Sequence, residues 1–127
     1  MARTVLIIDD DSDFVEATSV LLEAKGFTVI SAPNGAEGHA KAAAEKPDLL
    51  LLDVMMTYDS EGLDVATKLK QDPATRGIPV ILITGIRRAM NLPFGFEADD
   101  DALPVKAVLE KPVKPELLLS TIEKALA

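Results

Sequence analysis

The chain of 127 residues contains no cysteine, which excludes disulfide bonds, cysteine-based zinc clusters and thiol nucleophiles. It has one histidine, His39, in an alanine-rich segment with no second base nearby, so we expect a surface residue and not a catalytic one. Basic residues are few: 13 Lys and Arg against 21 Asp and Glu give a net charge of -8, which disfavours direct binding to DNA or RNA. Because no apolar run approaches the ~20 residues of a membrane span and no signal peptide is evident, we expect a cytoplasmic protein outside the membrane.

Short apolar runs alternate along the chain with longer segments of helical periodicity, which is typical of βαβ units and a parallel sheet. The length fits one α/β domain spanning residues 1–127. Five runs rich in Val, Ile and Leu are predicted to be buried strands. They are Thr4–Ile8, Thr28–Ser31, Leu49–Leu52, Val80–Ile83 and Ala107–Leu109.

Helices are predicted in the segments between these strands. The first starts near Ser12 or Asp13 and ends before Gly26, the second covers residues 35–44, and the third covers roughly residues 63–70. The first helix is expected to pack through Phe14, Ala17, Leu21 and Leu22, and a final helix after Lys114-Pro115 through Leu117, Leu118, Ile122 and Leu126. Proline and glycine interrupt residues 87–106, so a helix there is remodelled, short or absent.

Carboxylates follow two of the predicted strands. Asp53 comes directly after Leu49–Leu52, and Asp9 and Asp10 come directly after Val5–Ile8. The carboxyl ends of parallel strands meet at one edge of the sheet, so these side chains are expected to converge there. Three carboxylates close together repel one another unless a cation joins them, and Mg²⁺ prefers such oxygen ligands.

Two more polar residues follow strands at the same predicted edge. Thr84 can donate a hydrogen bond from its hydroxyl group, and Lys111 carries an ammonium charge. With the metal, they would contact the three oxygens of a phosphoryl group, while Asp53 acts as the nucleophile. The sequence thus predicts a magnesium-dependent phosphoryl-transfer site.

Four motifs carry a resemblance to a known family. The segments Ile7–Asp11, Leu51–Met56, Ile83–Gly85 and Glu110–Pro112 closely resemble the receiver domain of two-component response regulators, in order and approximate spacing. The resemblance covers nearly the whole chain. It implies a flavodoxin-like, doubly wound, five-stranded parallel sheet with strand order 2-1-3-4-5.

The resemblance also implies roles for individual residues. Asp53 would accept a phosphoryl group from a sensor histidine kinase or phosphotransfer protein. Asp9, Asp10, Asp53 and the backbone carbonyl of Met55 would hold Mg²⁺, and Thr84 and Lys111 would bind phosphoryl oxygens. The Lys111–Pro112 peptide bond would be cis.

The chain departs from the family pattern in the later loops. Thr57 occupies a position usually held by proline, and the segment between Thr84 and Lys111 is several residues longer than is common. Val108 stands where receivers carry a switch aromatic, so we expect signalling through an altered surface at residues 87–109. In the family, the positions two beyond Asp53 and two beyond Thr84 tune the access of water to the acyl phosphate. Here they are the apolar residues Met55 and Ile86, which predicts slow autodephosphorylation.

Alternative interpretations remain open. A pseudo-receiver would bind partners without phosphorylation. The motif order also resembles haloacid-dehalogenase-type phosphatases, with Asp9 as nucleophile and Asp11 as acid/base, but that reading leaves Asp53 without a role. Asp9 and Asp10 could also merely cap the first helix, as could Asp11 or Asp13. The downstream target is unknown, and both a monomer and a phosphorylation-dependent dimer are compatible with the sequence.

Overall fold

A computed structural model of the chain describes residues 3–53, 67–84, 107–110 and 113–126. Several sequence predictions lie outside these residues. They concern Met55, Lys111, the cis Lys111–Pro112 peptide, the loop at residues 57–62, Ile86 and the fourth helix within residues 87–106.

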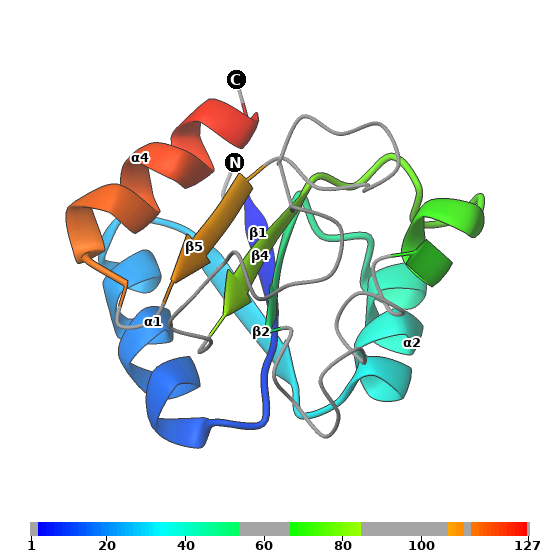
Figure 1. Ribbon diagram of the computed structural model, residues 1–127, viewed down its shortest axis with the longest axis horizontal. Helices are drawn as coiled ribbons and strands as arrows, with labels where there is room; N and C mark the ends of the chain where they lie inside the picture. Colours follow the sequence, from blue (N-terminus) through cyan, green and yellow to red (C-terminus); the bar gives the residue numbers. More distant parts are fainter. Residues whose placement is uncertain (1–2, 54–66, 85–106, 111–112, 127) are drawn as a thin grey trace.

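Five parallel strands form one sheet in the order β2-β1-β3-β4-β5, which confirms the predicted topology (Figure 1). The predicted positions hold, although four of the five strands extend one residue further than expected. The strands are β1 (Thr4–Ile8), β2 (Thr28–Ala32), β3 (Leu49–Asp53), β4 (Val80–Thr84) and β5 (Ala107–Glu110). Asp53 and Thr84 are therefore the last residues of their strands.

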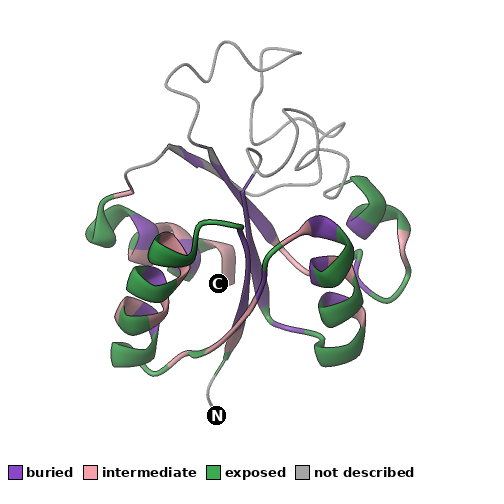
Figure 2. Ribbon diagram, turned by 90° about the horizontal axis from the view of Figure 1, so that it is seen from below, coloured by how far each residue is buried: buried purple, intermediate pink, exposed green. Residues whose placement is uncertain are grey.

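Helices cover both faces of the sheet (Figures 1 and 2). Helices α1 (Ser12–Ala24) and α4 (Pro115–Leu126) pack on one face, and α2 (Gly35–Glu45) on the other, beside a helical segment at residues 67–71. Because side chains alternate along a strand, Leu6 and Ile8 of β1 face α2, whereas Val5 and Ile7 face α1 and α4. Both faces of the central strands are thus buried, as expected of a doubly wound sheet. None of the described helices is long and apolar enough to cross a membrane.

Two predictions about helix faces were wrong. Leu117 is 50% exposed, because Leu118 and Ile122, four residues apart, form the buried face of α4 and the preceding residue points about 100° away. In α1 the buried residues are Thr18 and Leu22, and the predicted core residue Ala17 is exposed.

The contact between α2 and β1 depends on a glycine. A Cβ atom on Gly38 would lie 2.5 Å from Cδ1 of Ile8, which is far inside van der Waals contact. The backbone of α2 therefore packs directly against the Ile8 side chain at this point. Ile8 is the last residue of β1, so this contact supports the chain immediately before Asp9.

Candidate functional site

Parallel pairing brings the predicted carboxylates together. Ile8 of β1 is in register with Leu52 of β3, so Asp9 and Asp53 each come one residue beyond this pair. Oxygen atoms of Asp9, Asp10 and Asp53 all lie within 4.8 Å of one another. This convergence at the carboxyl edge of the sheet is what the sequence predicted.

The three carboxylates differ in exposure. Asp9 and Asp53 are only 3% and 4% exposed, whereas Asp10 faces solvent. A buried carboxylate loses hydration, and like charges at this separation repel one another strongly. A divalent cation with oxygen preference relieves both effects, and this oxygen-only donor set fits Mg²⁺ better than zinc. The residues present therefore fit the predicted metal.

Backbone contacts hold Asp9 in place. Its N–H donates to the carbonyl of Ala32 at 3.0 Å, which ties it to the end of β2. Its Oδ1 accepts the backbone N–H of Asp11 at 2.8 Å. Helix α1 begins at Ser12 as predicted, and its N-cap is Asp11, one of the candidate caps, so Asp9 and Asp10 do not cap this helix.

Of the other predicted site residues, the structure describes the backbone position of Thr84 but not Lys111 or Met55. Asp53 pairs with Ile83, so Thr84 ends β4 one residue further along the same edge. Thr84 is in register with Glu110, which immediately precedes Lys111 in the chain. Lys111 and Met55 themselves lie outside the described residues, so their roles stay predictions.

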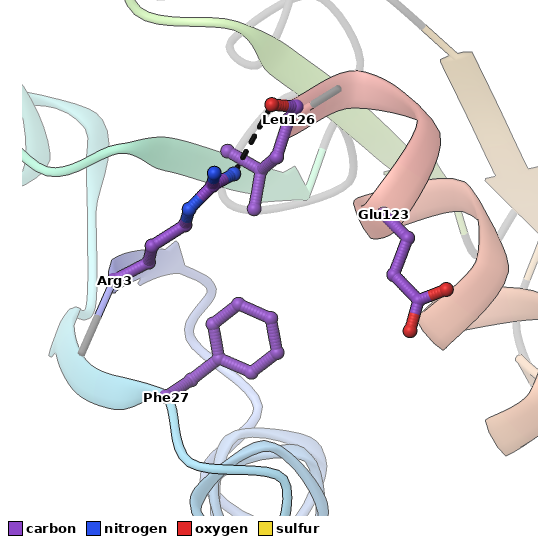
Figure 3. A pocket seen from close by; sticks show the side chains of 4 residues that line it. All are labelled: Arg3, Phe27, Glu123 and Leu126. Atoms are coloured by element: carbon purple, nitrogen blue, oxygen red, sulfur yellow. Dashed lines mark hydrogen bonds between the residues drawn. The ribbon is translucent and has the colours of Figure 1, made fainter. Parts of the chain in front are cut away.

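A cavity lies at the end of the sheet where β1 and β2 begin, opposite the carboxylates, and Figure 3 shows the side chains that line it. It has a volume of about 290 Å³ and is lined by Arg3, Phe27, Glu123 and Leu126. The Arg3 guanidinium group donates to the carbonyl oxygen of Leu126 at 3.1 Å, at the C-terminus of α4. This contact satisfies a carbonyl group at the end of that helix, so we assign it a structural role.

Sequence reasoning missed a partner of His39. Its Nε2 lies 2.7 Å from Oδ2 of Asp72, and both side chains are about 30% exposed, so the expected surface histidine is in fact half-buried. The other oxygen of Asp72 accepts the N–H of Ala74 at 2.9 Å. This backbone hydrogen bond, followed by the one to His39, lowers the pKa of Asp72. The pair joins α2 to the turn after residues 67–71. Because His39 and Asp72 are 33 positions apart, no local sequence pattern predicts their contact.

The strand order, the helices on both faces and the acidic edge define a flavodoxin-like domain of the CheY-like class. The family model of the response regulator receiver domain matches residues 5–123. The chain therefore belongs to the response regulator receiver domain family. This membership confirms the resemblance inferred from the four sequence motifs.

Individual relatives agree with this assignment. Protein PilH of Pseudomonas aeruginosa is 35% identical over 127 residues, covering 100% of this chain and 99% of the relative. The phosphate regulon transcriptional regulatory protein PhoB of the same organism is 33% identical over 126 residues, but the chain spans only 52% of its length. A CheY-like receiver domain structure from Methanospirillum hungatei has a TM-score of 0.83 at 30% identity, covering 99% of this chain and 94% of the other.

Proposed function

We propose that this receiver domain is a phosphoacceptor switch that takes a phosphoryl group on Asp53 in a Mg²⁺-dependent reaction. The convergence of Asp9, Asp10 and Asp53 at one edge of the sheet is the observation that carries the proposal. Family membership supports a phosphohistidine donor on a sensor histidine kinase or phosphotransfer protein. It also supports a cytoplasmic site of action, where such donors present their phosphohistidine.

Asp9, Asp10, Asp53 and the Met55 carbonyl would hold Mg²⁺, which would neutralise charge on the phosphoryl oxygens when bound. A carboxylate oxygen of Asp53 attacks phosphorus, and the bond from phosphorus to the donor imidazole nitrogen breaks with its electron pair moving to that nitrogen. The Thr84 hydroxyl group donates a hydrogen bond to one phosphoryl oxygen. The Lys111 ammonium group pairs with another. The products are an aspartyl phosphate and a dephosphorylated donor.

Asp53 is better suited than Asp9 to be the nucleophile. Asp53 ends β3, whose neighbour β4 ends at Thr84, so nucleophile and predicted hydroxyl donor lie on adjacent strands. Asp9 already accepts the Asp11 amide with Oδ1. A phosphatase mechanism with Asp9 as nucleophile would leave the buried Asp53 unused.

Output is proposed to pass through an altered surface at residues 87–109, toward a downstream protein. Val108 in place of an aromatic residue and the lengthened segment before Lys111 motivate this part of the proposal. We expect residues 87–106 to change their amide hydrogen exchange when a phosphoryl mimic is added. Unchanged protection along that whole segment would eliminate this output route.

The direct test is chemical labelling of the acceptor. The protein is incubated with Mg²⁺ and acetyl phosphate, reduced with borohydride, digested and analysed by mass spectrometry, with Asp53→Asn as control. Labelling of Asp53 in the wild type, lost on chelation of Mg²⁺, is the expected result. Labelling of Asp9 with phosphate turnover would indicate a phosphatase instead, and no labelling at all would indicate a pseudo-receiver. The labelled form is expected to decay slowly without a partner; decay within seconds would contradict the prediction from Met55 and Ile86.

A further inference from the structure

We propose that Asp11 is a positioning residue for the carboxylate site. By capping α1 it fixes the turn between β1 and α1, and the amide of this turn orients the carboxylate of Asp9. The inference rests on the proposed function, because the orientation of Asp9 matters most if Asp9 binds a cation. It gives a role to the third aspartate of the Asp9-Asp10-Asp11 run, which is neither the phosphoacceptor nor a proposed metal ligand.

Three groups of Asp11 make hydrogen bonds: its side-chain carboxylate, its backbone carbonyl and its backbone N–H. Its Oδ1 accepts the backbone N–H groups of Asp13 at 3.1 Å and Phe14 at 3.2 Å. Amides of the first helical turn have no carbonyl acceptor within the helix, so the Asp11 side chain takes that place. Its carbonyl oxygen accepts the N–H of Val15 at 3.0 Å. Its own N–H donates to Oδ1 of Asp9 at 2.8 Å.

These contacts couple the cap to the site through the backbone. Asp11 has φ -87° and ψ 99°, the extended conformation of an N-cap, and its side chain stabilises that conformation by accepting the helix amides. Without this acceptor the turn loosens, and the Asp11 amide no longer has a fixed direction. Asp9 is 3% exposed, so water has little access to replace that donor.

The Asp11 amide acts on the carboxylate group of Asp9 itself. The other backbone contact, from Asp9 N–H to Ala32, fixes where the Asp9 backbone lies but not how its side chain is turned. A hydrogen bond from a backbone amide to a carboxylate is among the stronger ones in proteins. With Oδ1 held in this way, the carboxylate is set in one orientation within the cluster.

Two other roles for Asp11 fit the geometry less well. As an additional metal ligand it would join the group whose oxygens lie within 4.8 Å, but among the described residues that group consists of Asp9, Asp10 and Asp53. A role as general acid or base would not explain why its Oδ1 accepts two amides of the first helical turn. The helix cap accounts for these contacts directly.

The test compares variants of equal charge. Asp11→Asn and Asp11→Ser keep a capping side chain, whereas Asp11→Ala removes it, and all three lose the same negative charge. Asn34→Ala is the matched control, because Asn34 caps a different helix, α2, by accepting the N–H of Glu37. Mg²⁺ affinity is measured by calorimetry, and the amide proton shift of residue 11 is measured by NMR in metal-free protein.

We expect Asp11→Ala to bind Mg²⁺ about tenfold more weakly than Asp11→Asn, the range seen when a supporting hydrogen bond to a metal ligand is lost. The amide proton of residue 11 should stay downfield in Asp11→Asn and Asp11→Ser and move upfield in Asp11→Ala. Asn34→Ala should lose stability but keep its Mg²⁺ affinity. If Asp11→Ala does not fold, Asp11→Gly replaces it, because glycine suits the cap backbone yet offers no acceptor.

Equal Mg²⁺ affinities and equal amide shifts for the alanine and asparagine variants would overturn the inference. So would an equal loss of affinity in Asn34→Ala, which would show that general destabilisation is the cause. Absence of Mg²⁺ binding by the wild type is a separate outcome: it would refute the proposed function and this role with it.

Discussion

Replacing Gly38 with alanine should destabilise the protein, because α2 leaves no space for a methyl group where it crosses β1. The new Cβ atom would lie 2.5 Å from Cδ1, 2.6 Å from Cγ1 and 3.0 Å from Cγ2 of Ile8. Ile8 is 0% exposed, so its side chain is packed on all sides and cannot move away without displacing other core residues.

Two opposing effects set the size of this loss. Overpacking a well-packed core costs about 1–3 kcal/mol, and three contacts at or below 3.0 Å favour the upper half of that range. Replacing glycine by alanine inside a helix returns about 0.5–1 kcal/mol through backbone entropy. We therefore expect the free energy of unfolding to fall by about 1–2 kcal/mol.

Two other glycines supply matched controls in urea denaturation. A Cβ atom on Gly77 meets nothing within 4 Å, and Gly77 has no positive φ, so Gly77→Ala should be neutral or stabilising by about 0.4–1 kcal/mol. Gly26 is equally open but has φ 92°, so Gly26→Ala should destabilise through backbone strain alone. The three identical substitutions thus separate lack of space from backbone conformation.

A second change at Ile8 tests the cause. Ile8→Ala removes Cδ1, Cγ1 and Cγ2, the three atoms that the new methyl group would meet, so adding Gly38→Ala to that background should cost less than it does in the wild type. A coupling of about 0.5–3 kcal/mol is expected for such a contacting pair. Wild-type stability in Gly38→Ala, or an undiminished cost in the Ile8→Ala background, would refute the reasoning.

Three further predictions follow from single contacts. Lys46 ends α2 with φ 48°, a conformation that suits glycine, so Lys46→Gly should raise the free energy of unfolding by about 0.5–1 kcal/mol; unchanged or lower stability in urea would contradict this. The pKa of Asp72 is lowered in the folded state, so its contribution to stability is present above the ordinary carboxyl pKa and is lost as the pH falls through the folded value. The stability difference between wild type and Asp72→Ala should therefore persist down to about pH 5 and shrink at lower pH. A stability difference that grows below pH ~5 would contradict this prediction. Asp53→Asn should stabilise the metal-free protein by about 1–3 kcal/mol by removing repulsion from Asp9 and Asp10, while reducing the rise in melting temperature that Mg²⁺ produces; a less stable metal-free variant would count against this.

Much of the sheet could be predicted from the sequence, because its strands are short apolar runs that are buried on both faces. The convergence of Asp9 and Asp53 followed from the same pattern, since residues after neighbouring parallel strands must share an edge. Periodicity was less informative about which residues of a helix face inward. Leu117 looked like a core residue by its type, yet the direction of α4 turns it to solvent.

Contacts between distant or competing groups could not be predicted. The pairing of His39 with Asp72 depends on how α2 packs beside a turn 33 residues later. The sequence offered Asp11 as one of several candidate caps of the first helix, but the choice among them depends on the backbone angles after β1. Neither the residue types nor their spacing specify these details.

The carboxylate cluster and its supporting contacts act in opposite directions on stability. Three like charges within 4.8 Å destabilise the metal-free fold, and two of them are buried. The contact between Gly38 and Ile8 and the hydrogen bonds from Asp9 to Ala32 and from Asp11 to Asp9 oppose that effect by fixing the chain around Asp9. A cation can then bind to ligands already in place, and most of its binding energy appears as added stability instead of being spent on reorganisation.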